Sequence, residues 1–212
     1  MALVWRALLT AARTPALWGA MAAQGVLFSL YLLVWGDGLP LVGARSTLEQ
    51  FATLQWIVLG LALPWTAARS GVVRGRNEVA RLAVLGAVPP SSIVTAGVAA
   101  LVVVLLTLAA VGLPFAMLAQ QISAVPTTEL LRTQLPLYAL GLCAAPITAA
   151  CMLVAASRFT AWTASTALTL AVVALVPQGL GGSLVLVVLG AIVVAAIVSG
   201  ADRRFWYLSE QA

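Results

Sequence analysis

Long runs of apolar residues alternate along this chain with short stretches that hold nearly all of its charged residues. A helix of roughly 20 apolar residues crosses the hydrocarbon core of a bilayer, which is about 30 Å thick. No stretch alternates apolar and polar residues as the strands of an outer-membrane barrel do, so we expect an all-α membrane protein. Six runs predict transmembrane helices, at about residues 17–36, 50–68, 92–114, 136–156, 160–177 and 183–200.

The connections between these runs are short, apart from residues 115–135, which leave room for a small external helix around 128–134. Pro64, Pro114 and Pro146 lie within or at the end of apolar runs, where a proline removes a backbone hydrogen bond. We expect each of them to kink or end its helix. The chain has no internal repeat and no change of composition that marks a second domain, so its 212 residues form a single transmembrane domain.

Residues 2–14 predict a helix that lies along the membrane surface. At helical spacing Trp5 and Leu8 fall on one face and Arg6 and Arg13 on the other, the pattern of an amphipathic interfacial helix. A cleaved signal peptide is the alternative. The apolar run that follows is as long as a full span and comes after two arginines, which favours the interfacial helix.

Composition agrees with a membrane protein. Hydrophobic residues make up 63% of the chain and charged residues only 8%, and the mean hydropathy is +1.09. The net charge of +5 would suggest nucleic acid in a soluble protein, but here the arginines lie between apolar runs and form no single basic face. We therefore expect membrane lipids and no nucleic acid as partners, and interpret the arginines as determinants of topology.

The arginines predict how the chain is oriented. Positive residues of short loops stay on the cytoplasmic side of a membrane. With both termini cytoplasmic, only Arg45 and Arg132 lie outside, which makes a multi-pass protein with cytoplasmic ends the expected topology. The nine inner arginines are then Arg6, Arg13, Arg69, Arg74, Arg76, Arg81, Arg158, Arg203 and Arg204.

The residue inventory excludes many membrane enzymes. Zinc proteases and serine proteases need histidine as a ligand or base, and the chain has none. The six carboxylates are spread over segments on both sides, so no paired acids for general acid–base work or for Mg²⁺ are visible. Cys143 and Cys151 are interpreted as packing residues. We expect no enzymatic activity, no metal site and no cofactor in this chain.

Ion-coupled transport is disfavoured as well. A charged side chain at the centre of a span costs roughly 2.5 to 3.5 kcal/mol on insertion scales and marks an ion or proton pathway. None of the six predicted spans contains such a residue, and the chain has no Gly-x-x-x-x-Gly-Lys-Ser/Thr phosphate loop. If this protein moves a substrate uphill, a partner must supply the energy.

The most informative segment is the charged loop at residues 69–92. Asn77 predicts the cap of a short helix that ends near Gly86, before Pro89-Pro90, and Glu78 suits its positive end. Arg81 and Glu78 are placed to pair with each other or with a docked protein. The alternative is an interfacial loop whose arginines hold lipid phosphates. The apolar positions of this helix at helical spacing are Val79, Leu82 and Leu85.

This arrangement resembles the permease subunits of ATP-binding-cassette exporters of the type-2 permease superfamily. Those subunits have an amino-terminal interfacial helix, six spans with cytoplasmic ends, and a coupling helix between spans two and three. The run from Glu78 to Val94 is similar to the family's leucine-rich stretch before proline and span three. The chain departs from the family at Gly97-Val98, where a lysine is frequent, and in the short distance between Pro177 and Ser183.

The resemblance implies a dimer, with a second copy or a paralogue, seated on ATPase subunits that hold ATP and Mg²⁺. Glu78 and Arg81 would then make polar contacts with the ATPase, and Val79 and Leu82 apolar ones, within a coupling helix that also includes Asn77 and Leu85. The translocation path of such dimers is lined by spans one, two and five. In this chain those spans offer Gln24, Ser29, Gln55 and the row Thr160, Thr163, Thr166 and Thr169, for which helix packing is the alternative role.

The function expected from the resemblance is export of a hydrophobic or amphiphilic substrate across a bacterial inner membrane, driven by a separate ATPase. One alternative is a permease of cytochrome c maturation, similar to heme exporters. Because the chain lacks histidine, any heme would sit on a partner. The other alternative is a membrane scaffold or assembly factor that transports nothing.

Overall fold

A computed structural model describes residues 2–35, 47–70, 72, 75–86, 88–155, 157–175 and 180–209. All regular secondary structure in these ranges is helical, as predicted. Asp37, Arg45, Arg74 and residues 176–179 lie outside the described residues. The helices are α1 (Ala2–Ala12), α2 (Pro15–Trp35), α3 (Thr47–Ser70), α4 (Arg76–Gly86), α5 (Pro90–Ser123), α6 (Thr127–Val154), α7 (Arg158–Leu175) and α8 (Leu180–Ser209).

Six of these helices are long and apolar enough to cross a membrane, which is compatible with a multi-pass membrane protein. They are α2, α3, α5, α6, α7 and α8, in the order in which the apolar runs predict them. Helix α1 is too short to span, and α4 adds a short helix between the second and third long ones. The position of α1 along a membrane surface stays a prediction.

The predicted break at residues 115–135 is wrong. Helix α5 continues to Ser123 and α6 begins at Thr127, so the segment expected as a separate external helix forms the first turns of α6. The reversal between them takes three residues, with Ala124 in the left-handed conformation at φ 51° and ψ 32°. The Gln120 amide stabilises this turn by donating to the carbonyl oxygen of Val125 at 3.1 Å.

The prolines do not end their helices. Pro64 lies inside α3, Pro114 inside α5 and Pro146 inside α6, and each helix continues for several residues beyond its proline. Of the two effects expected of these prolines, a kink or a helix end, the helix end is wrong. Helices in membranes tolerate proline because neighbouring helices and local adjustments satisfy the freed backbone groups.

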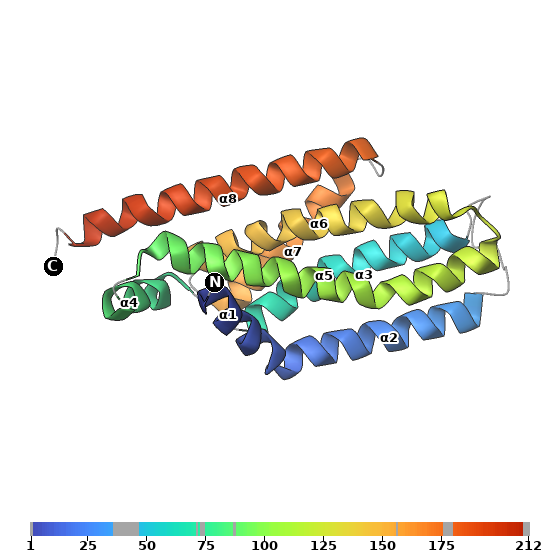
Figure 1. Ribbon diagram of the computed structural model, residues 1–212, viewed down its shortest axis with the longest axis horizontal. Coiled ribbons are helices and arrows are strands. Elements are labelled where there is room, and N and C mark those ends of the chain that lie inside the picture. Colours follow the sequence, from blue (N-terminus) through green and yellow to red (C-terminus); the bar gives the residue numbers. More distant parts are fainter. Residues whose placement is uncertain are drawn as a thin grey trace.

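Helices α5 and α6 form the centre of the bundle (Figure 1). Helix α5 contacts α1, α2, α3, α4, α6 and α8, and α6 also contacts α3, α7 and α8. The buried share of the apolar span is 56% for α5 and 67% for α6, but only 22% for α2, 17% for α7 and 22% for α8. These three outer helices therefore turn most of their apolar surface away from the protein.

The long helices run in alternating directions, which brings α1, α4, the start of α5 and the last turns of α8 to one end of the bundle (Figure 1). We call this the α4 end. The turn between α5 and α6 lies at the opposite end. All segments that carry several arginines are thereby gathered at one end, although they are far apart in the sequence.

The contact between α6 and α8 depends on a glycine. A Cβ atom added at Gly190 would lie 2.8 Å from the carbonyl oxygen of Leu142 and 3.2 Å from the Cα of Cys143. These are backbone atoms of α6, and they cannot move aside as the end of a flexible side chain would. Small residues allow such close backbone approach between membrane helices.

We predict that Gly190→Ala lowers the free energy of unfolding by about 1–3 kcal/mol, because α8 must move away from α6. The matched control is Gly25→Ala in α2, where an added Cβ meets no atom within 4 Å. Unfolding in mixed micelles measures both variants. Equal stability of the two variants would contradict the close packing of α6 and α8.

Candidate functional site

Helix α4 begins directly after a glycine, Gly75. The amide groups of Glu78 and Val79 both donate to the carbonyl oxygen of Gly75 at 3.0 Å, and the helix runs from Arg76 to Gly86. Asn77 therefore lies inside the first turn and is not the cap that the sequence suggested. The side chain of Asn77 is outside the described part of the structure.

The two faces of α4 differ. Val79 is buried, with 4% of its surface exposed, and Leu82 is half-buried. Glu78, Arg81 and Leu85 lie on the neighbouring side of the helix and are exposed. Val79 and Leu82 thus contact the protein itself and are turned away from any docked subunit. The exposed apolar side chains of α4 are Leu85, at 73%, and Val84, at 78%. Leu85 is expected beside Val79 and Leu82, whereas Val84 is not singled out by the sequence pattern.

The α4 end carries most of the described cationic side chains. Glu78 is the acidic side chain that the structure describes at this end. Glu49, Glu129 and Arg132 belong to helix segments at the opposite end. There Arg132 forms an ion pair with Glu129 at 3.6 Å. This segregation agrees with the orientation predicted from the arginine count, which itself stays a prediction. The exposed arginines at the α4 end are Arg6, Arg13, Arg69, Arg81 and Arg158.

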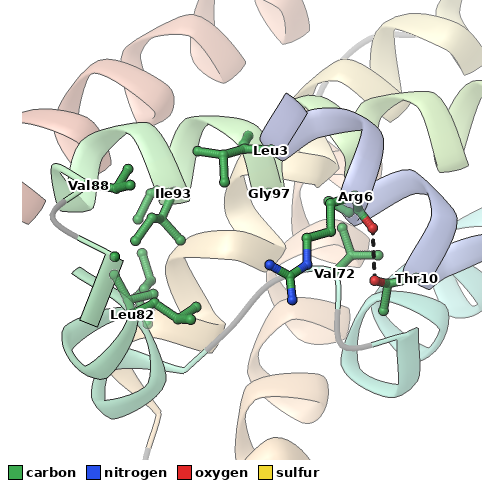
Figure 2. A pocket seen from close by; sticks show the side chains of 14 residues that line it. Leu3, Arg6, Thr10, Val72, Leu82, Val88, Ile93 and Gly97 are labelled. Carbon is green, nitrogen blue, oxygen red and sulfur yellow. Dashed lines mark hydrogen bonds between the residues drawn. The ribbon is translucent and has the colours of Figure 1, made fainter. Parts of the chain in front are cut away.

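A cavity of about 190 Å³ lies between α1, α4 and the first turns of α5 (Figure 2). Its polar lining comes from α1: Arg6 extends its side chain toward the space between Val72 and Leu82, and Thr10 bonds to the Arg6 carbonyl oxygen at 2.9 Å. The remaining lining is apolar or glycine, from Leu3, Ala7, Val72, Val79, Leu82, Gly86, Val88, Ile93, Val94, Ala96, Gly97 and Leu153. No pattern in the sequence predicts that Arg6 extends toward such a space.

Two of the predicted path residues lie in the bundle interior. Gln55 of α3 is 1% exposed and accepts a hydrogen bond of 2.8 Å from the side-chain amide of Gln134 in α6. Gln24 of α2 is 2% exposed, and neither polar atom of its side chain has a hydrogen-bond partner among the described residues. Gln55 therefore holds two helices together, whereas the Gln24 amide is buried without compensation.

The space around Gln55 is closely filled. A Cβ atom at Gly112 of α5 would clash with the Gln55 amide nitrogen and approach the Phe28 ring at 3.3 Å. Phe28 packs edge-on against Phe51 at 5.0 Å between ring centres. Gln24 lies one turn before Phe28 on the same face of α2, so it also faces the interior.

The threonine row of α7 does not form one surface. Because residues three apart are separated by 300° around a helix, the row turns from an exposed face to a buried one. Thr160 and Thr163 are exposed, Thr166 is half-buried and Thr169 is fully buried. The hydroxyls of Thr166 and Thr169 are buried and have no hydrogen-bond partner within the described ranges. The structure therefore does not bring all the predicted path residues together.

The remaining path candidate, Ser29, and the residue types that bind metals can also be placed. Ser29 of α2 is half-buried next to Phe28. Within the described residues no group of three Cys, Asp or Glu side chains could hold a metal ion. Cys143 is buried and Cys151 half-buried, and both thiols are free.

We predict that Gln134→Leu lowers the free energy of unfolding by about 1–3 kcal/mol, because it leaves the Gln55 amide buried without a partner. The double variant with Gln55→Leu should cost less than the sum of the single variants, with a coupling of about 0.6 kcal/mol and up to about 1.7 kcal/mol. Gln121→Leu, at an exposed position of α5, is the control. Strict additivity in the unfolding measurements would contradict a direct bond between Gln55 and Gln134.

The sequence matches no protein-family model, and comparison with curated proteins and with solved structures finds no match either. The function is therefore inferred from the residues and the geometry described above.

Proposed function

We propose that this chain is the transmembrane subunit of an ATP-binding-cassette exporter in a bacterial inner membrane. It would move a hydrophobic or amphiphilic substrate, using ATP hydrolysed by a separate subunit that docks on α4. The observation that carries the proposal is the outward face of α4, a short charged helix at the end of a bundle of six membrane-length helices.

The outward face of α4 suits a protein partner. An amphipathic helix that binds lipid turns its apolar face toward the membrane. In α4 the apolar residues Val79 and Leu82 are turned toward α1 and α5 instead, and Glu78 and Arg81 face away from the bundle. Leu85 and Val84 beside them expose most of their apolar surface, as residues at protein interfaces do.

The position of α4 also suits transmission of force. Its inner face packs against the first turns of α5, and α5 contacts five other helices of the chain. A push on α4 by an ATPase would therefore reach the centre of the bundle through α5. The energy must come from such a partner, because the chain itself has no phosphate-binding loop.

A second permease copy or paralogue completes the proposal. The outer helices α2 and α7 keep 22% and 17% of their spans buried within the subunit, which leaves apolar surface for a dimer contact. Gln24 and Thr166 remain path candidates, because their buried polar groups have no hydrogen-bond partner among the described residues. Gln55 is assigned to packing, since its side-chain oxygen accepts a hydrogen bond from Gln134.

The chain offers a matched pair of variants to test docking. Glu78 and Arg81 on α4 have the same spacing as Glu129 and Arg132 at the opposite end. We expect Glu78→Arg with Arg81→Glu to lower the ATPase activity of the complex, purified from the native host, by at least about tenfold, since like charges placed across an interface cost several kcal/mol. Glu129→Arg with Arg132→Glu should change the activity less than about twofold, as an exposed pair contributes about 1 kcal/mol or less.

Equal activity of the two exchanged variants would remove α4 as the docking site. Failure of any nucleotide-binding protein to purify with the chain would favour the membrane scaffold over the exporter. A heme absorbance band in the purified complex would instead favour the permease of cytochrome c maturation.

A further inference from the structure

The cavity between α1, α4 and α5 has no role in the proposed docking, because it lies on the inner side of α4. Its walls are apolar apart from Arg6 and Thr10 of α1. The Thr10 hydroxyl is already bonded to the Arg6 carbonyl oxygen. The guanidinium of Arg6 has neither a hydrogen bond nor an ion pair within the part of the chain that the structure describes. Arg6 is exposed, so its guanidinium at this apolar cavity is accessible to an anionic ligand that has an apolar portion.

The surroundings add to the positive charge of this cavity. Arg13, Arg69 and Arg81 lie at the same end of the bundle and are exposed. Acidic membrane lipids are attracted to such basic ends, by about 1 kcal/mol for each arginine near the surface. Negative charge is therefore favoured at the mouth of the cavity, where Arg6 lies.

The size of the cavity suits part of a lipid. A cavity of about 150 Å³ lined by apolar side chains holds one benzene molecule. The present cavity, of about 190 Å³, takes a piece of hydrocarbon slightly larger than that. A free phosphate ion would contact Arg6 but would leave the apolar walls without a partner.

Two exposed tryptophans near α1 favour a position of the cavity at the height of lipid headgroups. Trp5 is 64% exposed and Trp18 is 58% exposed, and the indole nitrogen of Trp18 donates to the carbonyl oxygen of Ala12 at 2.8 Å. Tryptophan is enriched where the bilayer meets water, because its ring is apolar and its N–H is polar. Arg6 lies between these two residues along the chain.

We propose that this cavity binds an anionic phospholipid, with the phosphate on Arg6 and the first carbons of one acyl chain between α1, α4 and α5. The bound lipid holds α1 and α4 against the start of α5. The site does not depend on the exporter function, since it would equally stabilise a scaffold.

Lipid-dependent thermal unfolding of the purified full chain tests the site. Dioleoyl phosphatidylglycerol, added in a neutral detergent, should raise the unfolding temperature, whereas dioleoyl phosphatidylcholine and inorganic phosphate should not. Arg6→Gln should weaken the apparent affinity for phosphatidylglycerol by about fivefold to tenfold, because one arginine–phosphate contact is lost. Arg13→Gln is the matched control, since Arg13 is exposed near the same helix and does not line the cavity.

Arg6→Lys provides a second variant should Arg6→Gln fail to fold. It keeps the charge without the planar fork of arginine, so it should retain part of the affinity. Equal losses in Arg6→Gln and Arg13→Gln would mean diffuse attraction and overturn the site. An equal rise of the unfolding temperature with inorganic phosphate would mean that the site binds any anion, and would overturn the proposal of a lipid ligand. The proposal would also be overturned if phosphatidylglycerol left the unfolding temperature unchanged, or if phosphatidylcholine raised it equally.

Discussion

The cost of placing charge in hydrocarbon is the constraint on which this structure depends. Between Arg132 and Arg158, and again from Arg158 to Asp202, the chain has no charged residue, and the α5 sequence has none at all. The charged side chains that the structure describes are thereby confined to the ends of the bundle. Because the helices alternate in direction, arginines from distant parts of the sequence meet at the α4 end. The charged surface that can bind a partner or a lipid is a consequence of this segregation.

An interior without charge must obtain its specificity from close packing and a few amide bonds. The bond between Gln55 and Gln134 joins α3 to α6, and Gly112 of α5 leaves the space that the Gln55 side chain needs. At Gly190 the absence of a side chain lets the backbones of α6 and α8 approach each other closely. These contacts hold the central helices, and through them α5 connects α4 to the rest of the bundle.

Hydropathy predicts the six long helices and their order, and the capping and proline signals predict the short helix before Pro89. Hydropathy fails at residues 115–135, where α5 and α6 continue through all but the three residues of the turn. Periodicity groups Val79, Leu82 and Leu85 on one face of α4, but only Val79 and Leu82 are covered by the bundle. The pattern does not tell whether a face meets lipid, a partner or the chain itself. The pairing of Gln55 with Gln134 spans 79 positions, and no local pattern signals it.

The most direct test of this account is the sidedness of the two ends. Single cysteines are introduced at Arg81 or at Arg132 in a chain whose Cys143 and Cys151 are replaced by alanine, and are labelled with a membrane-impermeant maleimide. We predict that the Arg81→Cys variant reacts in inverted inner-membrane vesicles and not in spheroplasts, and that the Arg132→Cys variant reacts in spheroplasts and not in inverted vesicles. Labelling of both variants from the same side, or the reverse pattern, would contradict the segregation of charge on which the proposed docking of an ATPase depends.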